Sequence, residues 1–206
     1  TMSNQILVPL DRSPIAASAL SHVLAVTQQH EAAITLIRVV EPAPEDASVI
    51  NPTDWQLRRT EASTYLDELV ADCAESCKAE VNKVIMEGPA ADRILEYAQE
   101  HGHDLIVISS HGKGGLSEWN VSSAALKVIN RCGIAVLLVR AYQVPEVESP
   151  GPIRPIRYRR ILVPLDGSLR SEHVLPVATR LAEKHEAELL LVHGVVKPEL
   201  FDHKPV

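Results

Sequence analysis

The chain contains 206 residues, of which 46 % are hydrophobic and 23 % are charged, a composition typical of globular proteins. With 20 Lys and Arg against 27 Asp and Glu, its formal charge of −7 argues against broad electrostatic attraction to nucleic acid or to anionic lipid. Apolar runs such as residues 134–139 are far shorter than the roughly 18 residues that cross a bilayer, and residues 2–5 carry no export signal. The three cysteines form no disulfide framework, so we expect a cytoplasmic protein.

The first 140 residues alternate between short apolar runs and segments with helical periodicity. A strand at 6–8 precedes a helix capped by Ser13, and a second strand at 34–40 is followed by a polar stretch at 41–54. A long helix follows, with Cys73 and Cys77 on its apolar stripe, and then a strand at 81–86. Gly88 and Pro89 open the next helix, which leads to a strand at 105–108. The last helix has an apolar stripe of Ala125, Val128, Ile129 and Cys132 and precedes a strand at 135–139. Near-continuous apolar strands that alternate with helices predict an α/β domain with a parallel sheet covered on both faces.

Residues 141–158 interrupt this pattern. They are rich in proline, a composition that excludes helix and favours extended backbone. We interpret them as a linker between a domain at 1–140 and a second segment at 159–206. The arginines at the end of the linker could contact a phosphate, although a solvated run of charge is the simpler interpretation.

After the linker the sequence repeats itself. Residues 161–166 are identical to residues 6–11, and at the same offset Ser168 matches Ser13 and residues 185–187 match residues 30–32. The copy ends soon after its second strand, so we expect residues 159–206 to form a truncated β-α-β second domain. Pro176 lies inside the helix of this copy and is expected to kink it.

Two loops at the carboxyl ends of predicted strands carry distinctive chemistry. Pro9, Leu10 and Asp11 end the first strand, and the Gly- and Ser-rich segment 109–115 leaves the fourth strand, with Ser122 and Ser123 before the next helix. Ligands of open α/β sheets bind outside the carboxyl ends of the strands, and free N–H groups at a helix N-terminus attract phosphate. The arrangement suits a nucleotide, although such loops are often plain turns and the two serines could only be helix caps.

The complete domain resembles the universal stress protein family. The resemblance is carried by ILVPLD at the start, GPAAD before the third helix, DLIVISSHGKGGLSEW and the closing AVLLVR, and it covers residues 5–140 and again 159 to about 198. It implies an open five-stranded parallel sheet of order 3-2-1-4-5, which brings the loops after strands one and four together.

The resemblance also implies a binding site for ATP or another adenine nucleotide, with Mg²⁺ as a candidate counter-ion. Asp11 would face the adenosine, Pro9 and Leu10 would line the base pocket, and Val39 and Ile108 would sandwich the adenine. The phosphates would be held by Gly112, Ser122, Ser123 and the N–H of Ala124, with Lys113 as a counter-charge. Asp11 as a helix cap and Lys113 as solvated surface are the alternative interpretations.

The phosphate motif departs from the family pattern of Gly, two residues, Gly, nine residues, then Gly and a hydroxyl residue. Aligned on Gly112, the first glycine is replaced by Ser109 and the third by Ser122, while Ser123 supplies the final hydroxyl. Each replacement adds a Cβ and a hydroxyl close to the expected phosphate path and removes access to positive φ. Weakened binding and lost binding are both compatible with these changes.

Other chemistry-bearing residues have simpler interpretations. Cys73 and Cys77 share an apolar stripe and are expected to pack in the core, because no second His or Cys pair completes a metal site. His111 belongs to no Ser-His-acid arrangement, and His101 and His103 suit the carbonyl end of a helix. We therefore expect no catalytic residues, with slow ATP hydrolysis left open.

The sequence thus predicts a stress-response module that binds an adenine nucleotide. The alternative is a nucleotide-free protein-interaction module of the same fold. The apolar strand at 135–139 lacks a partner strand from the truncated copy, so we expect a homodimer through this edge. Neither nucleic acid nor membrane is an expected partner.

Overall fold

The computed structural model describes residues 5–27, 32–41, 52–77, 79–110, 122–140 and 153–195. Contacts divide the chain into two compact units, residues 1–156 and residues 157–206. The division falls within the segment 141–158 that the sequence marks as a linker. In the described residues, no helix is both long and apolar enough to cross a membrane.

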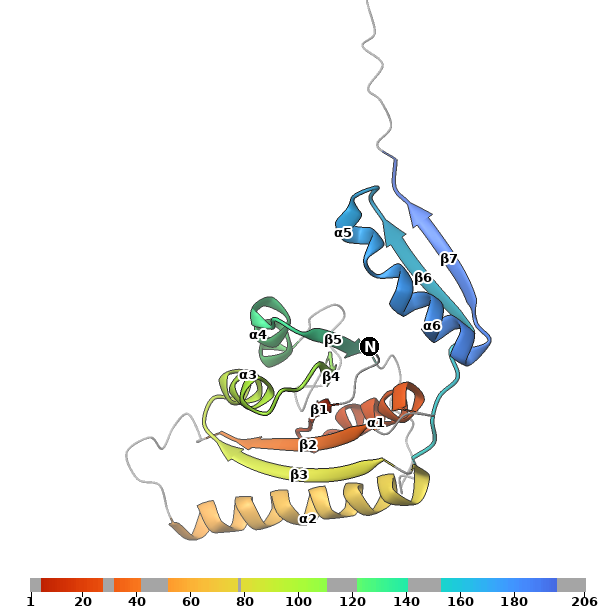
Figure 1. Cartoon of the computed structure of the whole chain (residues 1–206). Helices are drawn as coiled ribbons and strands as arrows, with labels where there is room; N and C mark the ends of the chain where they lie inside the picture. Colours follow the sequence, from red (N-terminus) through yellow and green to blue (C-terminus); the bar gives the residue numbers. More distant parts are fainter. Residues whose placement is uncertain are drawn as a thin grey trace, which may run out of the picture. The chain divides into compact units, whose positions relative to one another are not determined.

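The described residues of the first unit form five strands and four helices. In chain order they are β1 Gln5–Pro9, α1 Pro14–Thr27, β2 Ala33–Val40, α2 Pro52–Ser76, β3 Glu80–Glu87, α3 Ala90–Glu100, β4 Leu105–Ser109, α4 Ser123–Arg131 and β5 Ala135–Val139. The strands form one parallel sheet of order β3-β2-β1-β4-β5, which confirms the predicted fold (Figure 1).

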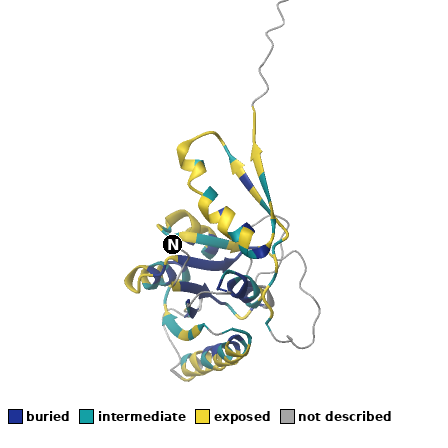
Figure 2. Cartoon of the chain, turned by 45° about the vertical axis from the view of Figure 1, so that its right-hand side comes forward, coloured by how far each residue is buried: buried dark blue, intermediate teal, exposed yellow. Residues whose placement is uncertain are grey.

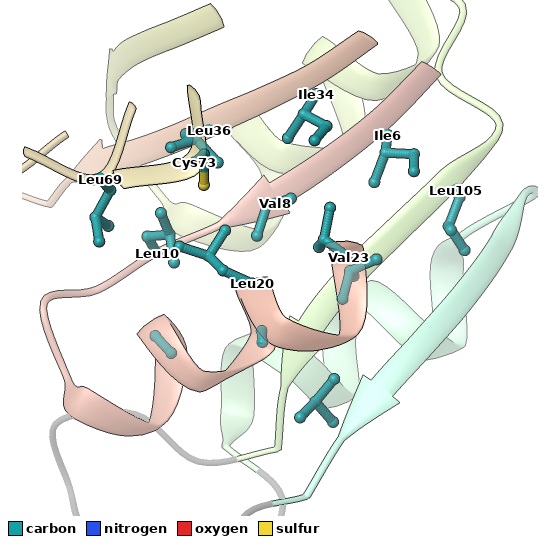
Figure 3. Packing of buried hydrophobic residues seen from close by; sticks show 14 of the residues in the cluster. Ile6, Val8, Leu10, Leu20, Val23, Ile34, Leu36, Leu69, Cys73 and Leu105 are labelled. Atoms are coloured by element: carbon teal, nitrogen blue, oxygen red, sulfur yellow. The ribbon is translucent and has the colours of Figure 1, made fainter. Parts of the chain in front are cut away.

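Each face of the sheet is covered by two helices, because the strand side chains alternate between two apolar clusters. Ile6, Val8, Ile34 and Leu36 pack with α1 and α2, and Figure 3 shows Leu10, Leu20 and Cys73 among them. Leu7, Ile37, Val39 and Ile106 pack on the opposite side with α3 and α4. The central strands β1 and β4 are therefore almost completely buried, as Figure 2 shows in dark blue.

Local signals place the helix starts close to their predicted positions. The Ser13 hydroxyl accepts the Ala16 amide at 3.0 Å and so caps α1. Pro89 stands at the N-cap of α3 instead of inside its first turn, and the Glu41 carboxylate accepts the Ala90 amide at 2.8 Å. The carboxylate of Glu41, the residue that follows β2, therefore binds the first backbone amide of α3.

The described part of the second unit consists of β6 Arg160–Leu165, α5 Leu169–Glu172, α6 Leu175–His185 and β7 Glu188–His193. Strands β6 and β7 pair in parallel, so the predicted β-α-β segment is present. The expected kink at Pro176 is wrong: the chain forms two helices, and Pro176 lies in the first turn of α6. Proline is tolerated there because first-turn N–H groups have no intrahelical partner, so it starts a helix instead of bending one.

Candidate functional site

A cleft lies where β1, β2 and β4 end in the first unit. It has an empty volume of about 480 Å³, part of which is open solvent. The described residues that line it are Pro9, Leu10, Asp11, Ala16, Ile37, Arg38, Val39, Ala90, Ile94, Ile108, Ser109, Ser122 and Ala124. The sheet order reverses at this edge, because β2 and β4 flank β1 on opposite sides, and such switch points are where open α/β sheets bind ligands.

Most of the predicted site residues meet in this cleft. Pro9, Leu10, Asp11, Val39, Ile108, Ser109, Ser122 and Ala124 all line it. Ser123 is the first residue of α4 and is not among the described lining residues. Gly112 and Lys113 lie outside the described residues, as does His111.

The inner wall of the cleft is apolar. Val39 and Ile108 come from the strands on either side of β1, and both are buried in the cluster that packs on α3 and α4. Ile94 of α3 joins the same cluster and lines the same cleft. A flat apolar group that entered between β2 and β4 would therefore meet side chains fixed by the core.

The loop that follows β1 holds Asp11 in a defined turn. The Ser13 amide donates to Asp11 Oδ1 at 3.0 Å, and Arg12 between them adopts φ 69°. The capping hydroxyl of α1 belongs to Ser13, so Asp11 orders the turn ahead of the helix and is not itself its N-cap. A left-handed conformation at a residue other than glycine is uncommon, and such strain is concentrated at functional sites.

Arg38 and Tyr65 are polar residues that interact with Asp11, and the sequence analysis did not single them out. Arg38 Nη1 donates to the Leu10 carbonyl oxygen at 3.1 Å, and burial lowers the pKa of Arg38 against an opposing effect of Asp11. Burial, reinforced by Asp11, raises the pKa of Tyr65 to about 12. The one available signal for Arg38 was that it is the single charged residue within the predicted strand 34–40.

The serines at the phosphate side of the cleft already make internal hydrogen bonds. The Ser110 amide donates to the Val139 carbonyl at 2.8 Å, and the Ser122 amide donates to the Ser110 carbonyl at 2.7 Å. The Ser122 hydroxyl accepts the Ala125 amide at 3.2 Å and caps α4. The first-turn amides of Ser123 and Ala124 have no intrahelical acceptor, so they are the donors that α4 offers to an anion.

The remaining candidates are structural. Cys73 is fully buried in the core, as predicted, and burial raises the pKa of its thiol to about 12. His101 Nδ1 contacts the Tyr97 carbonyl at the end of α3, as expected. His103 does not contact the helix carbonyls through its imidazole. Its side chain is buried two residues before β4, with Nε2 3.3 Å from Thr35 Oγ1, because the chain has already turned toward the sheet. Within the described ranges, no group of three or more His, Cys, Asp or Glu side chains is arranged to hold a metal.

Comparison with known proteins identifies the family. The profile of the Universal stress protein family matches residues 2–140 and again residues 157–203. The chain belongs to the universal stress protein family. The repeat therefore corresponds to one long family match and a second, shorter one.

Individual relatives agree with this assignment. A universal stress protein of Synechocystis is 30 % identical over 141 residues, which cover 67 % of this chain and 86 % of the relative. The structure of the universal stress protein UspA from Lactobacillus plantarum has 25 % sequence identity and a TM-score of 0.61, over 68 % of this chain and 99 % of that chain. A universal stress protein solved in complex with cAMP shares the fold at 16 % identity and a TM-score of 0.53, over 68 % of this chain and 98 % of that chain.

Proposed function

We propose that the first unit binds ATP or a related adenine nucleotide and acts as a nucleotide-dependent stress-response module. The observation that carries the proposal is the convergence of Pro9, Leu10, Asp11, Val39, Ile108, Ser109, Ser122 and Ala124 on one cleft at the switch point of the sheet. A family member with the same fold has been solved with cAMP, which is also an adenine nucleotide.

The geometry gives each group a role in the proposed complex. The adenine would lie between Val39 and Ile108, whose positions are fixed by the core. The Asp11 carboxylate would accept hydrogen bonds from the ribose hydroxyls, since an ionised carboxylate is purely an acceptor. The phosphates would face the amides of Ser123 and Ala124, where the positive end of the α4 dipole favours negative charge. Gly112, Lys113 and any Mg²⁺ would complete the phosphate side.

One observation favours the alternative, a nucleotide-free interaction module. The Ser122 amide donates to the Ser110 carbonyl, so it is not available to a phosphate without rearrangement, and the Ser122 hydroxyl is held in place by accepting the Ala125 amide. Side chains at Ser109 and Ser122 also occupy space that glycine would leave open. We therefore propose weak binding, governed by Asp11 and the two α4 amides.

We propose that the protein is a binder and not an enzyme. Asp11 is the one carboxylate among the described residues that line the cleft. It already accepts the Ser13 amide, and no histidine lines the described part of the cleft to act as a general base. Slow ATP hydrolysis would require a group outside these residues.

The proposed assembly is a homodimer through β5. This strand pairs with β4 alone in the described sheet, and Leu138 on it is 38 % exposed. An apolar edge strand is a template for pairing, and a two-fold contact requires only one self-complementary surface.

The deciding experiment compares two equivalent aspartates. Purified protein is denatured and analysed for released nucleotide, and ATP affinity is measured by calorimetry for the wild type, Asp11→Ala and Asp166→Ala. Asp166 accepts the Ser168 amide in the second unit as Asp11 accepts the Ser13 amide in the first, so it is a matched control. We expect Asp11→Ala to weaken binding about tenfold or more, because a hydrogen bond to a charged group is worth about 1.5–3 kcal/mol. Asp166→Ala should leave affinity unchanged.

The nucleotide proposal fails if the wild type releases no nucleotide and shows neither heat of binding nor a thermal shift at millimolar ATP. Equal losses in Asp11→Ala and Asp166→Ala would place binding outside this cleft. ATP turnover abolished by Asp11→Ala would show that the protein is an enzyme.

A further inference from the structure

Both backbone groups of Leu10 are held by β2. The Leu10 amide donates to the Ile37 carbonyl at 2.9 Å, which continues the β1–β2 ladder one residue past the end of β1. The Leu10 carbonyl oxygen accepts from Arg38 Nη1 at 3.1 Å, so a side chain provides the next contact. Leu10 directly precedes Asp11, and this pair of bonds sets where the Asp11 turn begins.

The second unit repeats this arrangement with a different side chain. At the offset that aligns the two copies, Leu165 matches Leu10 and His193 matches Arg38. His193 Nδ1 lies 2.8 Å from the Leu165 carbonyl oxygen, and because a carbonyl only accepts, the imidazole is the donor. What the two units share is a hydrogen-bond donor at the end of the second strand, not an arginine charge.

The turn beyond the donor is repeated as well. The Ser168 amide donates to Asp166 Oδ1 at 2.9 Å, and the Ser171 amide donates to the Ser168 hydroxyl at 3.1 Å. Gly167 adopts φ 81° where Arg12 in the first unit adopts φ 69°. The same turn forms around glycine and around arginine, so the flanking hydrogen bonds, and not the identity of the middle residue, define it.

The surroundings of Arg38 leave its guanidinium few competing partners. Among the described residues, its side chain makes one hydrogen bond, to Leu10. Asp11, Tyr65, Arg12 and Glu41 are the charged or titratable groups that interact with it, and the Tyr65 hydroxyl is buried without a hydrogen-bond partner in the described part of the chain. Arg12 instead forms an ion pair with Glu61 on α2, with Nη1 2.6 Å from Oε2.

We infer that Arg38 is a positioning residue of the cleft, which presents Asp11 to the ligand by donating a hydrogen bond to the Leu10 carbonyl oxygen. The inference rests on the proposed nucleotide function and adds to it a residue outside the strand-end motifs. In this role Arg38 acts as a hydrogen-bond donor. If Arg38 were instead a counter-charge to the ligand phosphates, ATP binding by Arg38→His would depend on pH, because only a protonated imidazole carries a positive charge.

The test uses the full chain and three variants. Arg38→Met removes the donor and keeps the length, and Arg38→His supplies the donor found in the second unit. Arg59→Met, the control, removes an exposed arginine of α2 that pairs with Glu87 of β3. ATP affinity is measured by calorimetry at pH 6 and pH 8. Amide exchange of Leu10 and Ser13 is measured by NMR without ATP.

We expect Arg38→Met to weaken ATP binding about tenfold and to accelerate exchange of the Leu10 and Ser13 amides, as loss of a hydrogen bond that orders the turn requires. Arg38→His should bind within about threefold of the wild type at both pH values, because a neutral imidazole still donates through one nitrogen. Arg59→Met should match the wild type in both measurements.

Three outcomes overturn the inference: unchanged affinity in Arg38→Met, unchanged exchange in Arg38→Met, or binding by Arg38→His at pH 6 alone, which would make Arg38 a charge contact. If the wild type itself binds no ATP, the nucleotide proposal fails. Amide exchange then decides this inference separately, because faster exchange in Arg38→Met supports the positioning of the turn and unchanged exchange refutes it.

Discussion

Ser109 and Ser122 replace two glycines of the nucleotide-binding pattern that the sequence resemblance implies. Both line the cleft, and Ser109 is buried at the end of β4 while Ser122 caps α4. In the proposed nucleotide complex, their hydroxyls and Cβ atoms would narrow the path of the phosphate chain. The N-terminus of α4 still offers two first-turn amides, those of Ser123 and Ala124, which have no acceptor within the helix.

Replacement of both serines by glycine should therefore tighten ATP binding. We expect Ser109→Gly with Ser122→Gly to improve affinity about threefold or more, equivalent to about 0.7 kcal/mol. The fold should tolerate the change, because glycine at an N-cap costs only about a few tenths of a kcal/mol relative to serine. Calorimetry checks the prediction, with Ser168→Gly at the α5 cap as the control. Unchanged affinity in the double variant would show that the backbone already accommodates the phosphates.

His103 makes the stability of the first unit depend on pH. Burial, assisted by His101, lowers the pKa of His103, and burial alone lowers that of His22. The unfolded chain therefore binds protons at a higher pH than the folded chain, so stability is complete above the ordinary histidine pKa of about 6.5 and falls as the pH drops below it. We expect urea unfolding at pH 5 to require less denaturant than at pH 8.

His103→Gln should flatten this dependence, since the amide stays neutral, while His22 retains a smaller slope. The exposed His173 on the second unit provides a control, and His173→Gln should leave the pH profile of the first unit unchanged. A profile for His103→Gln as steep as that of the wild type would refute the assignment.

At the scale of elements, strands were predictable because a strand covered on both faces needs a near-continuous apolar run, even where β2 includes Arg38 and β3 includes Lys83. Every predicted strand of the first unit formed, and β5 has the predicted bounds. The turn residues were less informative. The sequence around Pro176 is compatible with a kinked helix and with a helix that starts at the proline. The structure decides between them, because α5 ends at Glu172 and α6 begins at Leu175. His103 shows the same difficulty, because it lies only two residues beyond the C-cap at His101, yet its side chain is buried in the core.

The sequence predicted those cleft residues that lie at the ends of strands or at the start of a helix. Pro9, Leu10, Asp11 and Ser122 were singled out because they follow a predicted strand or precede a predicted helix, and the resemblance then implied their roles toward a nucleotide. Arg38 and Tyr65 interact with Asp11 from β2 and α2, far away in sequence, and no local periodicity links them to the loop. Such contacts depend on the packing of α2 against the sheet, which a one-dimensional pattern does not encode.

Strand β5 carries the prediction about assembly. If two copies pair at this edge, a charge placed there must be desolvated in the dimer but not in the monomer. We expect Leu138→Lys to convert a dimer into a monomer in size-exclusion chromatography with light scattering. Leu57→Lys, at a position 58 % exposed on α2, is the control and should remain dimeric. A monomeric wild type at micromolar concentration, or a dimer that survives Leu138→Lys, contradicts the proposed interface.

At the scale of the whole molecule, the two units differ in how much they bury. The first has two apolar clusters, one on each face of its sheet. Among the described residues of the second unit, Val163, Ala178, Ala182 and His185 are buried, whereas Leu162 and Leu191 on its strands are 61 % and 58 % exposed. Figure 2 shows most of the described part of this unit as exposed, in yellow. A two-stranded sheet with one covered face has little apolar burial to offset the entropy of folding.

The second unit should therefore unfold before the first. We expect hydrogen exchange followed by mass spectrometry in increasing urea to show loss of protection at residues 160–193 while residues 5–40 remain protected. The repeat supplies a matched pair of variants, because Val163 occupies the position of Val8 in the duplicated strand and both are buried. Each valine-to-alanine change should cost about 0.5–3 kcal/mol in its own unit. Val163→Ala should abolish protection of residues 160–193 and leave the first unit unchanged, whereas Val8→Ala should lower the urea midpoint of the first unit only. A single cooperative transition shared by both units, shifted equally by either variant, would show instead that the two copies fold as one.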